Sequence, residues 1–177
     1  MAITSAEPNV PPAWFSRVGA PFAPAEQAAI AALIEGHAGL VRAEVGAVAD
    51  WHEAGAFLRA AERDDAWWEH EEEERTRLWD CAADRIAEDD LLARLAAVTR
   101  ALTAAVHDAA AAAAARAGGT DPALVRAAAG AALLAAQQHA LAGLAGEAAT
   151  HFFTGKYALF AGGRWPLGYH RGRYAVF

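Results

Sequence analysis

The stretch that decides the fold is Ala123–Phe160, which reads ALVRAAAGAALLAAQQHALAGLAGEAATHFFTGKYALF. It is rich in Ala and Leu, which favour helix, and no Asp, Glu, Lys or Arg occurs from Ala127 to Gly146. At about 100° per residue, one narrow stripe collects Leu134, Leu141, Ala148, Phe152 and Leu159. Because a helix that is apolar nearly all round belongs inside a bundle, we predict one long central helix, opened by Asp121–Pro122.

The rest of the chain predicts further helices between an irregular arm and a short tail. Four prolines in Met1–Ala23 exclude a regular helix there, and the aromatic residues of this arm should lie against the body. Turn, capping and apolar patterns predict helices over Pro24–Val45, Ala47–Arg63, from Asp64 or Asp65 to before Glu88–Asp90, and from there to Gly118. Residues 161–177 alternate aromatic and polar side chains, which indicates a hairpin or hooked tail.

The predicted fold is therefore all-α: an antiparallel bundle of about five helices in a single domain, residues 1–177. Within it, residues 1–23 form the arm, 24–160 the bundle and 161–177 the aromatic, basic tail. Gln137, Gln138 and His139 interrupt the apolar stretch, so we expect no membrane span.

Composition narrows the class of partner and the compartment. The formal net charge of −7 argues against nucleic acid as a partner. Cys81 is the one cysteine, so no disulfide can form within the chain, which suits a reducing compartment. The first residues lack the pattern of a signal peptide. We therefore expect a soluble, cytoplasmic protein.

Several ionisable residues fall inside otherwise apolar helix faces, where an unpaired charge is costly. Carboxylates and imidazoles that converge from several helices build di-metal centres in bundles, and such ligands suit Fe, Mn or Zn. A site of this kind would give oxidoreductase or hydrolase activity. The candidate ligands are His37, Glu44, Glu71, Glu147 and His151, with His70 and Glu74 as further possibilities.

Two other interpretations explain the same residues without a metal. In the first, each charge is neutralised within the chain: Glu71 by Arg75 or by a Trp indole, Glu147 by His151, and His37 as a satisfied core histidine. In the second, the residues line an acid/base or ligand pocket. No complete catalytic motif decides among these three, because the chain has no phosphate-binding Gly-rich loop, and its two serines both lie in the arm.

The tail offers a different kind of site. Aromatic and Arg side chains are typical interface residues, so we expect the tail to contact a protein partner, to mediate self-association, or to dock on its own bundle. The interface candidates are Trp165, Tyr169, Arg171, Arg173 and Tyr174. The leading functional prediction is a helical interaction or scaffold protein, and deletion of Arg164–Phe177 should then impair partner binding or assembly.

Overall fold

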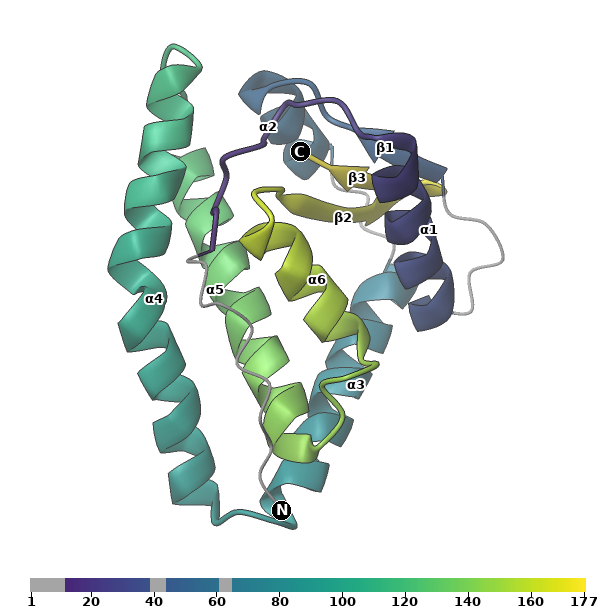
Figure 1. The fold of residues 1–177 in the computed structure, drawn as a ribbon, viewed down its shortest axis with the longest axis vertical. Coiled ribbons are helices and arrows are strands. Elements are labelled where there is room, and N and C mark those ends of the chain that lie inside the picture. The colour runs from purple at the N-terminus through teal and green to yellow at the C-terminus, as the bar shows by residue number, and fades with distance from the viewer. Residues whose placement is uncertain (1–11, 39–43, 61–64) are drawn as a thin grey trace.

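The structure is a computed structural model that describes residues 12–38, 44–60 and 65–177. These residues form six helices and three short strands (Figure 1), so the prediction of a mostly helical chain is confirmed. The elements are α1 (Pro24–Ala38), β1 (Glu44–Ala47), α2 (Trp51–Arg59), α3 (Asp65–Ala83), α4 (Glu88–Arg116), α5 (Pro122–Ala145), α6 (Phe152–Ala161), β2 (Pro166–His170) and β3 (Arg173–Val176).

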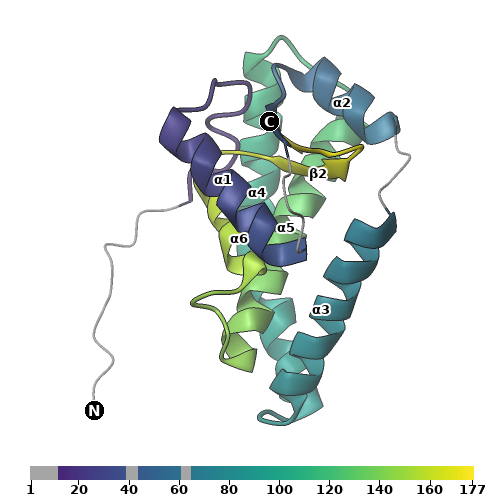
Figure 2. The ribbon, with the colours of Figure 1, turned by 90° about the vertical axis from the view of Figure 1, so that its right-hand side faces the viewer.

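Helix α5 is the central element, in agreement with its composition. It packs against α4, α6 and α3 (Figures 1 and 2), and its inward positions are mostly Ala, which lets the neighbouring backbones approach closely. Asp121 caps its start by accepting a hydrogen bond from the Ala123 amide at 2.8 Å. No helix among the described residues is both long and apolar enough to cross a bilayer.

The predicted single helix over Ala123–Phe160 is wrong, because the chain breaks after Ala145. Gly146 adopts a left-handed conformation at φ 83°, which glycine reaches without steric cost, and the Glu147 amide then bonds to the Ala142 carbonyl at 2.8 Å. His151 caps the next helix, α6, through its Nδ1, which accepts from the Phe153 amide. Phe152 and Leu159 therefore belong to a different helix from Leu134 and Leu141.

The C-terminal tail forms the predicted hairpin, and a third strand that the sequence pattern does not predict joins it. β2 and β3 pair antiparallel, and β1 pairs parallel to β3, giving the order β1-β3-β2. Val45 lies opposite Tyr174 in this register. The sheet lies at one end of the molecule beside α1 and α2 (Figure 1).

Strand β1 corrects the predicted helix over Pro24–Val45. α1 ends at Ala38, residues 39–43 lie outside the described residues, and Glu44 and Val45 are in a strand. Pairing with a strand almost 130 residues away along the sequence leaves no local signal. The second predicted helix is also shorter than expected, since α2 begins at Trp51, where Asp50 caps it by accepting from the Glu53 amide.

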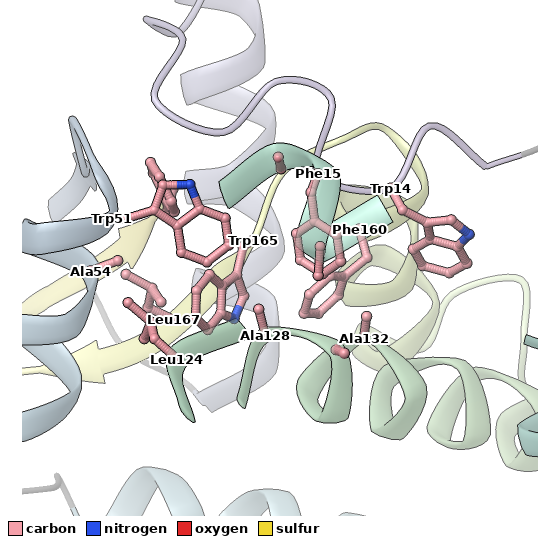
Figure 3. Close-up of a cluster of buried hydrophobic side chains, with 14 of the residues drawn as sticks. Trp14, Phe15, Trp51, Ala54, Leu124, Ala128, Ala132, Phe160, Trp165 and Leu167 are labelled. Carbon is pink, nitrogen blue, oxygen red and sulfur yellow. The ribbon is translucent and has the colours of Figure 1, made fainter. Parts of the chain in front are cut away.

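The hydrophobic core has two clusters that share α5. One joins the arm, α2, α4 and the start of the hairpin around the first half of α5, and Figure 3 shows Trp51, Trp165 and Phe160 among its members. The other joins α1, α3, α6 and the sheet around the second half of α5. Trp14 and Phe15 of the arm are buried, so the expectation that the arm lies against the body is confirmed for its described part.

Arg164 fastens the arm and α1 to the hairpin. Its guanidinium is buried and donates to both carboxylate oxygens of Glu26 at 3.0 Å. It also donates to the backbone carbonyls of Arg17, Ala20 and Pro21. These hydrogen bonds hold the first turn of α1, and the segment before it, against the residues that follow α6.

Candidate functional site: a pocket beside the hairpin

An apolar pocket opens between α2, α3, α5 and the hairpin. Its volume is about 190 Å³, and its lining is mainly apolar. Each neighbouring element contributes side chains: Phe57 and Leu58 from α2, Trp68 and Glu71 from α3, Ala127, Ala131 and Leu134 from α5, Lys156 from α6, and Trp165–His170 with Tyr174 from the tail. We call this cavity the hairpin pocket.

A buried ion pair forms the polar part of this pocket. Lys156 Nζ lies 3.0 Å from Glu71 Oε1 and 2.8 Å from Glu71 Oε2, and the two residues are only 8% and 5% exposed. The indole nitrogen of Trp67 donates to Glu71 Oε1 at 3.1 Å. The charge of each partner is therefore neutralised by the other, which is the condition under which such groups are tolerated away from water.

The phenol of Tyr174 is buried near the same ion pair. Burial raises the pKa of its phenol well above the ordinary value, and the nearby Glu71 carboxylate raises it further. The phenol is therefore neutral at physiological pH. The polar part of the pocket, which we call its floor, is thus one ammonium group and one carboxylate with no net charge. The rest of the lining is mainly apolar.

The rim of the pocket exposes large apolar side chains. Among the described residues only three large hydrophobic side chains count as exposed: Trp68, Leu92 and Leu134. Trp68 at 39% and Leu134 at 42% both line the hairpin pocket. Exposed apolar side chains beside a cavity are a feature of binding surfaces.

The five predicted metal ligands do not converge. Glu44 is exposed on β1, Glu71 is paired with Lys156, and Glu147 is paired with Arg77 through two contacts of 2.7 Å. Among the described residues, no group of three or more His, Cys, Asp or Glu side chains is arranged to hold a metal ion.

The remaining candidates form a separate histidine cluster around the end of α1. The His37 ring stacks on Phe152 with centroids 3.7 Å apart, and His70 Nε2 donates to the His37 backbone carbonyl at 2.7 Å. Because His151 Nδ1 accepts from the Phe153 amide, its Nε2 carries the proton and donates to Glu74 at 3.3 Å.

His37 is the exception among these groups, because its Nε2 is buried without a hydrogen-bond partner in the described part of the chain. Burial, together with the neighbouring His70, lowers its pKa to about 3. His37 is therefore a neutral ring packed on aromatic neighbours, and no described protein group bonds to this nitrogen.

For Glu147 the predicted pair is wrong, and for Glu71 the first of the two predicted alternatives is wrong. Arg75 bonds to the neighbouring Glu72 instead of Glu71, and Glu147 bonds to Arg77 instead of His151. The predicted bond from a Trp indole to Glu71 is confirmed by the Trp67 contact.

The tail residues divide between the interior and the surface. Trp165 and Tyr174 are buried, Tyr169 is half-buried, and all three line the hairpin pocket. Arg173 donates to the Ala47 carbonyl at 2.8 Å, and Arg171 is exposed at the turn. Because Trp165 and Tyr174 are part of the core, deletion of the tail would remove core packing as well as any interface.

Sequence reasoning misses the residues that make this site a pocket. The sequence patterns described above assign no role to Lys156, although it is the single charged residue between His151 and Ala161. Because an unpaired buried charge is costly, a single Lys in an otherwise apolar helix could have indicated a partner for Glu71. Helical periodicity assigns Leu134 to the buried stripe, whereas its position at the rim leaves it exposed.

Comparisons with protein-family models, with curated proteins and with solved structures return no match for this chain.

Proposed function

We propose that this chain is an interaction protein that binds a partner protein by accepting one large, ring-sized side chain into the hairpin pocket. The observation that carries the proposal is the pocket itself, where exposed Trp68 and Leu134 flank a cavity with a buried Glu71–Lys156 floor. Interface energy is commonly concentrated in a few large side chains that fill such pockets.

The size of the pocket supports a single side chain over a cofactor. Sites for drug-sized ligands typically measure about 300–1,000 Å³, whereas a cavity of about 150 Å³ holds one benzene molecule. At about 190 Å³ the hairpin pocket matches one ring-sized group. The exposed side chains of Trp68 and Leu134 at the rim support contact with the rest of the partner.

Charge supports a protein partner over nucleic acid. The chain carries a net charge of −7, and the cation of the pocket is neutralised by Glu71, so little remains to attract a phosphate backbone. The proposed location is the cytoplasm, on the ground of the single cysteine, Cys81.

Peptide selection tests the proposal because it does not require the partner protein to be identified. Random peptides displayed on phage are selected against the purified full chain, and the affinity of the selected peptides is measured by calorimetry. We expect peptides with a shared large residue, apolar or aromatic, whose affinity falls at least about tenfold, or ~1.4 kcal/mol, in Ala131→Phe, which places a ring in the pocket.

Matched substitutions outside the pocket provide the control. Ala101 is exposed on α4, so Ala101→Phe should leave peptide affinity unchanged. Leu92→Ala should also leave it unchanged, whereas the rim variant Leu134→Ala should weaken binding. Circular dichroism checks that each variant is folded. Failure to select any peptide, or equal affinity for wild type and Ala131→Phe, would contradict the proposal.

A further inference from the structure

We infer that the side chain received by the hairpin pocket is a phenol, that is, a tyrosine of the partner. The inference rests on the proposed function and adds the chemistry of the group that is bound. It follows from the hydrogen-bonding groups that line the pocket and from the neutrality of the pair they form.

Among the described residues, the Glu71–Lys156 pair has one donor and one acceptor without a hydrogen-bond partner. A Lys ammonium group has three N–H donors, and in the described part of the chain Lys156 uses two, both toward Glu71. Glu71 Oε1 already accepts from Lys156 and from Trp67, whereas Oε2 accepts only from Lys156 among the described residues. Each carboxylate oxygen has two lone pairs, so Oε2 retains one.

A hydroxyl group at the end of the bound side chain uses both groups at once. Its oxygen accepts the third N–H of Lys156, and its O–H donates to Glu71 Oε2. A purely apolar ring would cover the same two atoms without pairing them, and buried polar groups left unpaired are costly. Sites built to bond a hydroxyl therefore reject the analogue that lacks it.

Because the floor carries one positive and one negative charge, a charged ligand head group does not fit it. A carboxylate on the ligand would gain from Lys156 but would lie beside Glu71, whereas an ammonium group would meet the opposite problem. Because the two side chains lie within 3.0 Å of each other, a ligand head group cannot approach one without the other. A neutral group that both accepts and donates fits this floor.

The walls and the volume favour a ring in front of that hydroxyl. Phe57, Trp68 and Tyr169 bring aromatic side chains to the cavity, and aromatic rings attract one another in offset or edge contacts. The volume of about 190 Å³ exceeds by little the cavity of about 150 Å³ that holds benzene. A phenol ring is therefore both the right shape and the right polarity.

Side-chain analogues test the inference on the full chain. p-Cresol represents Tyr, toluene represents Phe, and 4-methylbenzoate represents a carboxylate head group. Dissociation constants are measured by NMR titration. We expect p-cresol to bind at least about tenfold more tightly than toluene, and more tightly than 4-methylbenzoate.

The second measurement repeats the titrations with a variant in which the floor of the pocket carries no charged group. In the double variant Glu71→Leu/Lys156→Met the volume is kept, and the preference for p-cresol over toluene should disappear. If the double variant fails to fold, the comparison of ligands in the wild-type protein still decides the question. The source of the phenol is tested by changing Tyr to Phe in any selected peptide, which should weaken its binding by a similar factor.

The outcomes separate this inference from the proposed function. Equal binding of toluene and p-cresol, or tighter binding of 4-methylbenzoate, would overturn the phenol and leave the pocket as a binding site. Peptides whose affinity does not depend on Tyr would overturn the partner's tyrosine as the source. Binding of none of the three probes would overturn the proposed function itself.

Discussion

At the scale of single residues, the buried pair Glu71–Lys156 governs both the stability and the chemistry of the hairpin pocket. Both side chains are almost completely buried, and each is the other's main electrostatic partner. Removal of one charge strands the other away from water, which typically costs about 3–5 kcal/mol.

A double-mutant cycle measures this dependence. Lys156→Met or Glu71→Leu alone should lower the free energy of unfolding by about 3 kcal/mol, whereas the double variant should be within ~1 kcal/mol of wild type, because apolar residues of similar volume can replace a buried pair. Urea unfolding provides the values. Small and additive losses in the two single variants would contradict the account of the pair.

His37 predicts how stability depends on pH. Its pKa is lowered to about 3 by burial in the folded chain, against about 6.5 when unfolded. Between these values the unfolded chain binds a proton that the folded chain does not, so stability is complete above about pH 6.5 and falls as the pH falls toward 3. Burial also lowers the pKa of His139, which acts in the same direction.

The pH effect of His37 can be isolated by substitution. We expect wild type to lose on the order of 1 kcal/mol between pH 7 and pH 5, and His37→Phe to lose measurably less, since Phe can stack on Phe152 without titrating. The carboxylates whose pKa values are lowered, such as Glu26 at about 2, titrate below this window. Urea unfolding at the two pH values gives these losses, and equal losses for wild type and His37→Phe would contradict this assignment.

At the scale of elements, local sequence signals predict where helices begin. They do not predict structure that depends on contacts with residues far away in the sequence. Pro24, Asp121–Pro122 and the acidic residues at Glu88–Asp90 mark helix starts that the structure has, because capping depends on neighbours within a turn. Strand β1 depends on β3 at the other end of the chain. The break at Gly146 depends on a backbone conformation that the Ala- and Leu-rich pattern does not reveal.

Arg164 joins three elements, so its loss should affect more than one contact. Arg164→Met removes the buried guanidinium that bonds Glu26 and three backbone carbonyls, and we expect a loss of about 3 kcal/mol in unfolding free energy. Arg17 also bonds Glu26, at 2.7 Å, but its side chain is 46% exposed. Arg17→Met should therefore cost below about 1 kcal/mol, and equal losses in the two variants would be inconsistent with this role.

The hairpin is part of the core, and its deletion should unfold the molecule. Removal of residues 164–177 would take away buried Trp165, Tyr174 and Phe177, and truncation of single buried aromatic side chains already costs about 3–5 kcal/mol each. We expect the shortened chain to lose cooperative thermal unfolding in circular dichroism. A shortened chain that still unfolds cooperatively near the wild-type temperature would show that the tail is an appendage.

At the scale of the whole molecule, the sequence indicates which buried charge needs a partner, but it does not indicate which residue that partner is. The position of Glu71 in an apolar face predicts that something must neutralise it. Its partner Lys156 lies 85 residues away, and such a distance along the sequence carries no periodic signal. The aromatic composition of the tail likewise indicates an important segment, yet only the fold places Trp165, Tyr169 and Tyr174 around a cavity.

The most direct measurement of the central claim is an NMR titration of the ¹⁵N-labelled full chain with p-cresol. We expect the amide shifts to concentrate in Phe57–Leu58, around Trp68, in α5 from Ala127 to Leu134, and in the hairpin from Trp165 to His170. No comparable shifts are expected in the first turns of α4. Shifts that are absent at millimolar p-cresol, or that cluster away from these residues, would contradict the assignment of the hairpin pocket as the binding site.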